Sequence, residues 1–382
     1  MKQVSLVTIF LIVVSLHAGA QGFYNNGSIL SLSSQAVVIV PDSLVNKGTI
    51  KNDGDLRITG AWINQGTYDA TALGKINFNS DLPQTINHND QSFKKLTISG
   101  TGEKQFLANI TIESELDLQN SNLKSVNGAK IIFAPGAVVT GGSNQSHIVG
   151  PVEVKGAGTW LFPVGNGTTY LPVEVLGITD ATAAGTIVLN ELSGQTLTGT
   201  PELVKLSTKR YWELNLNSGG INSSKIKLPL SNEEGLTANL ELLVVAASST
   251  ATSNYISIGQ SSRLGDLSSG SVTSEGTTIL KYYTVAAISG EPDIEVFNGI
   301  SPSIEGKNDF LKIKNIESYF DNEVTIFNRW GDRVFTITGY DNDTKVFRGE
   351  SNNGNKLPAG TYFYSIMLKV GLPIKNGYLE IR

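Results

Sequence analysis

The chain has 382 residues, with 29 Lys and Arg against 34 Asp and Glu, which gives a net charge of −5 at pH 7. This mild acidity argues against nucleic acid and anionic lipid as partners. The sequence contains no cysteine, which excludes disulfide bonds and cysteine-ligated metal sites. Only 16% of the residues are charged while glycine numbers 40, and short apolar runs alternate with turn residues, which predicts an all-β fold.

The first twenty residues are typical of a secretory signal peptide. Lys2 precedes an apolar run from Val4 to Leu16, and Ala18-Gly19-Ala20 supplies the small residues of a cleavage site. This run is too short to span a bilayer, and no later run approaches the roughly 20 apolar residues that a membrane-spanning helix needs. We therefore expect residues 1–20 to be removed and the rest to be exported, with no transmembrane span.

Residues 21–150 contain a repeated unit of the form Asn-x-Gly-hydroxyl-apolar. The unit begins at Asn25, Asn46 and Asn64, which gives spacings of 21 and 18 residues. Glycine supplies a positive-φ corner and Asn tolerates one, so each unit is expected to turn the chain into the next strand. A period near twenty residues, with two or three short strands per period, predicts a β-solenoid.

A boundary is expected at Gly150-Pro151, and two further β domains follow it. Residues 151–290 contain strand-like runs separated by turn signals, which predicts a β-sandwich. These runs lie at 159–165, 171–175, 209–214, 242–246 and 282–286. Residues 291–382 are again β-rich and are expected to form an independent, Ig-like β-sandwich. Its strands are expected at 294–297, 310–313, 324–327, 333–336, 361–368 and 378–381.

The strongest candidate for chemistry is the stretch 110–118. With a period of two, Glu113, Glu115 and Asp117 share one face and the apolar residues share the other. Neighbours on such a face stand about 7 Å apart, within the carboxylate separation of inverting glycosidases. An acid/base pair or a cation site is one reading. We expect instead a solvated strand face, because acid/base chemistry also needs a cleft that perturbs a pKa.

No other pattern points to a metal or a cofactor, and we expect none. His88 and His147 lie outside any metal-ligand spacing and no Gly-x-Ser-x-Gly elbow is present, so both are expected to be loop residues. The turns at 53–55 and 341–343 are rich in carboxylate and amide oxygens. Either Ca²⁺ or simple Asx turns explain them.

The C-terminal residues carry a set of motifs in a fixed order. They are Gly299-Ile300-Ser301-Pro302, Asn308-Asp309, Asn328-Arg329-Trp330-Gly331, Pro358-Ala359-Gly360-Thr361-Tyr362 and Gly377-Tyr378-Leu379. Together they resemble the gliding motility-associated C-terminal domain, the type B sorting domain of the bacterial type IX secretion system. Two departures stand out. Ser303-Ile304-Glu305-Gly306 replaces the family's Ser-Pro-Asn-Gly-Asp-Gly, and Phe347-Arg348-Gly349 replaces its Trp-Asp-Gly.

This resemblance implies export into the periplasm, passage through the outer membrane, and recognition of the C-terminal domain by the type IX machinery. In that setting we expect Trp330 to bury its ring over the sandwich edge, with Arg329 stacked on it or paired. Direct contact of Trp330 with the translocon is the alternative. Residues 84–98 and 147–165 also look like parts of the repeat-bearing surface proteins that precede such domains.

The sequence therefore predicts a non-enzymatic protein that is secreted or attached to the outer cell surface. It is expected to act in adhesion or as a structural surface component, with surface glycans or other envelope proteins as partners. One alternative is a polysaccharide-binding or polysaccharide-degrading protein that uses the acidic row on the solenoid. Another is a gliding or cell-envelope component that works within an assembly.

Overall fold

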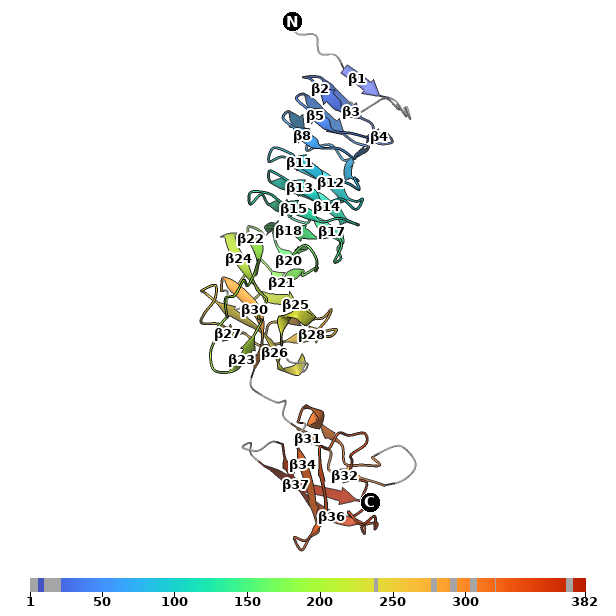
Figure 1. Ribbon diagram of the computed structural model, residues 1–382, viewed down its shortest axis with the longest axis vertical. Coiled ribbons are helices and arrows are strands. Elements are labelled where there is room, and N and C mark those ends of the chain that lie inside the picture. Colours follow the sequence, from blue (N-terminus) through green and yellow to red (C-terminus); the bar gives the residue numbers. More distant parts are fainter. Residues whose placement is uncertain are drawn as a thin grey trace. The chain divides into compact units, whose positions relative to one another are not determined.

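The computed structural model describes residues 6–9, 22–236, 240–275, 280–288, 294–302, 308–319, 321–368 and 374–382. The chain is all-β, with 50% of its residues in strands, as the sequence predicted. Helical elements in the described ranges are three 3₁₀ turns: η1 (Asn232–Glu234), η2 (Leu240–Leu242) and η3 (Ile316–Ser318). The chain divides into an N-terminal unit, Met1–Ile288, and a C-terminal unit, Ser289–Arg382 (Figure 1). The expected signal peptide lies outside the described residues apart from strand β1 (Leu6–Ile9).

The N-terminal unit begins with a β-solenoid of about seven turns, which confirms the prediction from the repeats. Its strands stack in parallel in three sheets (Figure 1). One sheet contains β2 (Phe23–Asn25), β5 (Leu44–Asn46), β8 (Trp62–Asn64), β11 (Gln84–Asn87), β13 (Lys104–Phe106), β15 (Leu123–Ser125) and β18 (Ile148–Val149). A second contains β1, β3 (Ile29–Leu32), β6 (Thr49–Asn52) and β9 (Thr67–Tyr68). The third contains β4 (Val37–Val40), β7 (Asp55–Ile58), β10 (Lys75–Phe78), β12 (Ser92–Ile98), β14 (Ile110–Leu118), β16 (Ile131–Phe133), β17 (Val138–Gly141) and β19 (Val152–Lys155).

The repeated asparagines form a ladder inside the solenoid, and they also hold the turns that follow them. Oδ1 of Asn25 accepts from the N–H of Ser28 at 3.1 Å, and Oδ1 of Asn46 accepts from that of Gly48 at 3.2 Å. Asn25 donates through Nδ2 to Oδ1 of Asn46 at 2.7 Å, and Asn46 donates in the same way to Asn64 at 2.7 Å. All three side chains are buried. Each amide therefore bonds to the amide of the next coil, as buried polar groups usually find partners within the protein. The ladder ends at Asn64, whose Nδ2 has no hydrogen-bond partner among the described residues.

Of the three repeated glycines, Gly27 adopts a positive φ of +86°, as expected, whereas Gly48 and Gly66 do not. Gly48 and Gly66 have a different role. A Cβ on Gly66 would lie 2.1 Å from the carbonyl oxygen of Gly48, and a Cβ on Gly48 would lie 2.1 Å from that of Ser28. Glycine is required at these positions because the backbone of one coil approaches the preceding coil too closely for any side chain.

An aromatic cluster around Trp62 fills coils three and four. The indole of Trp62 is fully buried, and its ring centroid lies 5.8–6.1 Å from those of its four aromatic neighbours. These neighbours are Tyr68, Phe78, His88 and Phe93. His88 stacks on Phe93 with a centroid distance of 3.6 Å. Asn87 is the register partner of Ile63, so the next residue, His88, lies beside Asn64 of the asparagine ladder. Both histidines lie outside strands, as predicted, but both are fully buried, which was not predicted.

The stability of the N-terminal unit should fall in mild acid because of His88. Nε1 of Trp62 donates to Nδ1 of His88 at 3.1 Å, and Nε2 lies 3.2 Å from the carbonyl oxygen of Ser92, so the ring is held neutral. Burial lowers the pKa of His88 to about 3 from 6.5. Below pH 6.5 the unfolded chain binds a proton that the native chain does not, so stability is full above pH 6.5 and is lost as pH falls. At pH 5 the expected loss is about 2 kcal/mol in the free energy of unfolding.

Urea unfolding at pH 7.5 and pH 5, followed by tryptophan fluorescence, measures this loss. His88→Asn, which matches the ladder residue in the preceding coil, should remove most of the difference. A remainder is expected from His147, because burial also lowers its pKa. An unchanged difference in His88→Asn would show that the acid sensitivity arises elsewhere.

The third sheet of the solenoid continues without a break into antiparallel strands that follow residue 151. β19 pairs in parallel with β16 on one side and antiparallel with β22 (Ala184–Glu191) on the other. The sheet continues through β24 (Arg210–Ser218), β30 (Tyr282–Ile288), β26 (Leu243–Ser248) and β27 (Ile256–Ser257), with β23 (Leu203–Leu206) beside β30. A second, antiparallel sheet contains β20 (Gly158–Phe162), β21 (Val173–Ile178), β25 (Lys225–Pro229), β29 (Ser271–Thr273) and β28 (Ser262–Leu264).

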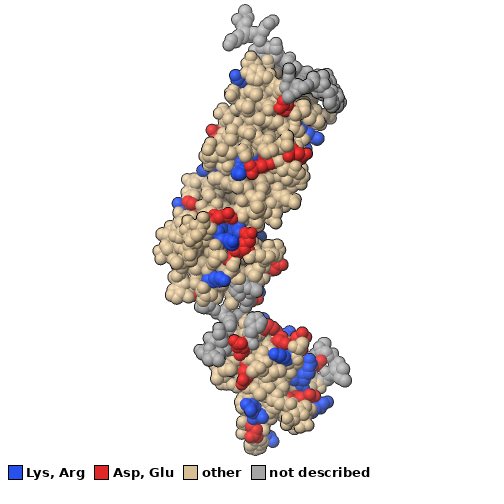
Figure 2. Space-filling model, viewed as in Figure 1, with Lys and Arg blue, Asp and Glu red and all other residues tan. Residues whose placement is uncertain are grey.

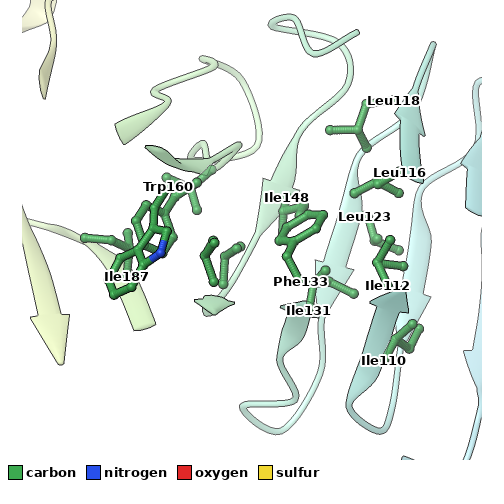
Figure 3. Close-up of a cluster of buried hydrophobic side chains, with 14 of the residues drawn as sticks. Ile110, Ile112, Leu116, Leu118, Leu123, Ile131, Phe133, Ile148, Trp160 and Ile187 are labelled. Carbon is green, nitrogen blue, oxygen red and sulfur yellow. The ribbon is translucent and has the colours of Figure 1, made fainter. Parts of the chain in front are cut away.

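One hydrophobic core extends across the expected boundary at Gly150-Pro151. Figure 3 shows Ile110, Phe133 and Ile148 of the solenoid in the same cluster as Trp160 and Ile187 of the antiparallel sheets. The cluster closes the last coil, which would otherwise expose its apolar interior. Solenoids require such a cap for solubility, and here the antiparallel strands provide it.

A buried ion pair lies in the antiparallel part of the N-terminal unit. Arg210 is fully buried, and its Nε lies 3.0 Å from Oε1 of Glu234, which is also buried. Nη2 of Arg210 lies 2.5 Å from the carboxylate of the half-exposed Glu233. Ser207 and Ser231 donate hydroxyl hydrogen bonds to Glu234. Burial raises the pKa of Glu234, and the charge of Arg210 opposes that rise.

The C-terminal unit is a β domain with its own core. Its five-stranded sheet has the order β32 (Gly299–Ile300), β37 (Lys375–Ile381), β36 (Gly360–Met367), β34 (Glu323–Phe327), β35 (Arg333–Thr338). A short pair, β31 (Glu295–Val296) and β33 (Ile313–Lys314), packs on the same core. In the described part of the chain no helix is long and apolar enough to cross a membrane.

Candidate functional site

The motif Asn328-Arg329-Trp330-Gly331 forms the turn between β34 and β35. Oδ1 of Asn328 accepts hydrogen bonds from the backbone N–H of Trp330 at 2.9 Å and of Asp332 at 3.0 Å, and its Nδ2 donates to the Asp332 carboxylate at 2.9 Å. Gly331 has φ of +88°, which a side chain would strain. Asn328 and Gly331 therefore fix the shape of the turn.

Trp330 does not bury its ring, contrary to expectation. Its side chain is 77% exposed, although an aromatic ring gains most by burial. The expected stacking is present, because the Arg329 guanidinium carbon lies 5.1 Å from the ring centroid. The core of the unit is already closed without Trp330 by residues such as Tyr340, Phe347 and Tyr362. The turn thus displays the indole on the surface.

The second part of the motif lies beside this turn. Pro358 and Gly360 lead into β36, and the hydroxyl of buried Tyr362 donates to the carbonyl oxygen of Pro358 at 3.0 Å. Residues 328–330 and 357–362, together with Val334, line a groove of about 330 Å³. The structure therefore brings the Asn328–Gly331 turn together with Pro358, Gly360 and Tyr362.

Asn308 and Asp309 lie apart from the turn. Asn308 has φ of +58°, and its carbonyl oxygen accepts a hydrogen bond from the N–H of Ser301 at 2.8 Å. Asp309 lines a second groove with Arg348 and Arg382, which does not include the turn residues but shares Leu357 and Ala359 with the groove beside the turn. These two motif residues shape another part of the domain.

The sequence-based prediction of the site missed an aromatic row on the outer face of the five-stranded sheet. Phe327 of β34 is the register partner of Phe363 of β36, which in turn is the register partner of Tyr378 of β37. Phe363 is 48% exposed and Tyr378 is 53% exposed. The consecutive aromatics Tyr362-Phe363-Tyr364 carried the signal, because alternation along a strand must turn at least one of them outward.

The pairing of the strand that carries the acidic row is interrupted. β14 pairs with β16 over residues 110–112 and with β17 over residues 115–118, and its register with β12 shifts between these stretches. Glu113 lies at that shift, and Glu113, Glu115 and Asp117 are all half-buried. Glu115 lies 4.0 Å from Nζ of Lys95, and Asp117 accepts from Gln119 and Thr140. The apolar residues of β14 face the core, as predicted.

The oxygen-rich turns are explained by hydrogen bonds within the chain. The Asp341 carboxylate accepts from the backbone N–H of Asp343, Thr344 and Lys345 and from the Thr344 hydroxyl, and these bonds lower its pKa to about 2. In the other turn, Asp55 pairs with Arg57 at 2.8 Å. Among the described residues, no group of three or more His, Asp or Glu side chains lies where it could hold a metal ion.

These features define the C-terminal unit as a β domain with its own core and an exposed aromatic site. Residues 294–381 match the family model described as the CHU_C type IX secretion signal domain. The C-terminal unit is therefore a type IX secretion signal domain, which confirms the resemblance carried by the motifs. Such a domain implies export to the cell surface or secretion, and interaction with the secretion machinery. No curated protein and no solved structure matches the chain.

Proposed function

We propose that the N-terminal unit is a non-enzymatic surface module, acting in adhesion or as a structural component, that the C-terminal unit delivers through the type IX system. The observation that carries this proposal is the single core that joins the solenoid to the antiparallel sheets. The acidic groups of the solenoid that were candidates for chemistry lie at a register shift or are engaged by neighbouring side chains. Surface glycans and other envelope proteins are the proposed partners.

A polysaccharide-binding or polysaccharide-degrading solenoid is the rival function. Sugar recognition usually requires exposed rings, yet Trp62, Tyr68, Phe78 and Phe93 all pack into the core, and the exposed rings of the described solenoid strands are Phe23 and Tyr24 of β2. The visible face of the N-terminal unit is also mostly uncharged (Figure 2). Binding of a glycan at millimolar ligand, or hydrolysis that Glu115→Ala abolishes, would favour the rival function.

The test of delivery compares the full chain with a chain truncated after Gly290. Both are expressed in the native host and in a mutant host without the type IX translocon, and their location is measured by fractionation and surface-protease accessibility. We expect only the full chain, and only in the intact host, to reach the surface or the medium. On the proposed route, which begins with removal of residues 1–20, the truncated chain stays in the periplasm. Surface arrival of the truncated chain would contradict the proposal.

A further inference from the structure

We propose that the secretion machinery binds the outer aromatic face of the C-terminal unit. We define this aromatic face as Phe327, Phe363 and Tyr378 with the neighbouring Trp330. The inference rests on the proposed function, because it assumes that the C-terminal unit delivers the chain. It adds the surface that the machinery contacts and the chemistry of the contact.

The aromatic face is separate from the core of the domain. Along β36, Tyr362 and Ile366 are buried in the core, whereas Phe363 between them points to the opposite side. Tyr378 likewise precedes the buried Leu379. The solvent side of an antiparallel sheet is normally polar. The next outward row across the same strands follows that rule, with Thr336, Thr325, Ser365 and Asn376 in register.

The four rings border one groove. It has a volume of about 690 Å³ and lies between the turn and the outer face of β34, β36 and β37. A fifth ring, Tyr364, also lines the groove, and its polar lining comes from Asn328, Arg329, Ser365 and Asn376. Because Asn328 fixes the turn by three side-chain hydrogen bonds, the backbone of Trp330 is held in place before any partner arrives. Rigid exposed aromatics of this kind are typical binding hot spots.

The charges around the aromatic face indicate the chemistry of the partner. Arg329 stacks on Trp330, and Arg333 is the register partner of Phe327. Among the described side chains, none forms an ion pair with either arginine, and no carboxylate lines the groove. A complementary partner therefore presents apolar side chains for the rings and at least one carboxylate for the arginines. We assign that partner to a protein of the type IX machinery, since a type IX secretion signal domain implies interaction with that machinery.

Photo-crosslinking tests which molecule meets this face. A photoreactive phenylalanine analogue is placed at position 363 of the full chain in the native host, and the matched control carries it at position 297. Phe297 is 45% exposed in the same unit but lies outside the aromatic face. We expect position 363, and not position 297, to crosslink to an outer-membrane component of the secretion machinery. Crosslinks from position 363 to a second copy of the chain or to glycan only would overturn the inference.

Surface delivery provides the second measurement. Trp330→Ala combined with Phe363→Ala should lower the delivered fraction by roughly tenfold or more, as expected for the loss of two hot-spot rings. Phe297→Ala should leave it unchanged. Calorimetry of the purified full chains checks that the C-terminal unit still folds. Tyr378→Ser, a second variant of the aromatic face, should also lower the delivered fraction.

The outcomes separate this inference from the proposed function. If truncation after Gly290 blocks delivery while the folded double variant is delivered normally, the aromatic face is not the contact and the proposed function stands. If the truncated chain also reaches the surface, the proposed function fails and the inference fails with it. If the double variant does not fold, the crosslinking result decides, because that experiment leaves the other three rings in place.

Discussion

Trp62→Ala is expected to lower the free energy of unfolding of the N-terminal unit by about 3–5 kcal/mol, the range for removal of a large buried ring. Trp62 is fully buried, and four aromatic rings surround it at centroid distances of 5.8–6.1 Å. The neighbours are fixed by the coils above and below, so the cavity cannot collapse. The indole also donates to His88, which loses that partner in the variant.

Urea unfolding of the full chain, followed by tryptophan fluorescence, measures this loss. The signal reports mainly on the N-terminal unit, because Trp160 and Trp212 are buried there and Trp330 is exposed. Trp330→Ala is the matched control and should change stability by less than about 0.5 kcal/mol. Trp62→Phe should fall between the two. A loss below about 1 kcal/mol for Trp62→Ala would mean that the coils repack and that the core is less rigid than the structure indicates.

Arg210→Met is expected to cost about 3–5 kcal/mol, because it leaves the buried Glu234 carboxylate without its cation. Both side chains of this pair are buried, and the two serine hydroxyls that donate to Glu234 cannot replace a full charge. The double variant Arg210→Met with Glu234→Leu should recover most of the loss, because an apolar pair needs no compensation.

The same unfolding assay tests this pair. Arg263→Met, which breaks the exposed pair with Glu241, should cost less than about 1 kcal/mol and serves as the control. Without Arg210 the pKa of Glu234 rises further, so the native variant binds a proton that the unfolded chain releases. The difference between Arg210→Met and the parent should therefore shrink as pH falls. A difference that is constant with pH would show that the lost packing of the Arg210 stem causes the effect.

The sequence was sufficient to predict the architecture because the repeats correspond to the coils of the solenoid and the motifs correspond to the C-terminal domain. A period near twenty residues sets the length of a coil, and the alternation in β14 separates core from solvent. The motif order predicted the type IX secretion signal domain. Local propensity did not reveal why Asn and Gly repeat, however. Asn46 pairs with residues 18 and 21 positions away, and Gly66 is constrained by the backbone of Gly48.

The candidate site was only partly predictable, since exposure depends on how completely other residues fill the core. Trp330 was expected to be buried because aromatic rings usually are, but Tyr340 and Phe347 already occupy the interior. The acidic row could not be judged from period alone, because the register shift between β12 and β14 and the contacts of Glu115 and Asp117 depend on neighbouring strands. The partners of Arg210 lie 23 and 24 residues further along the chain, beyond any local pattern.

The unbroken third sheet gives the N-terminal unit a mechanical property. Parallel pairing up to β19 and antiparallel pairing from β22 onward share one ladder of backbone hydrogen bonds. A pull on the first coils along the stacking direction is therefore carried as tension along the hydrogen bonds of this ladder and into the antiparallel strands. Separating the coils from those strands requires breaking the hydrogen bonds of a whole strand pair.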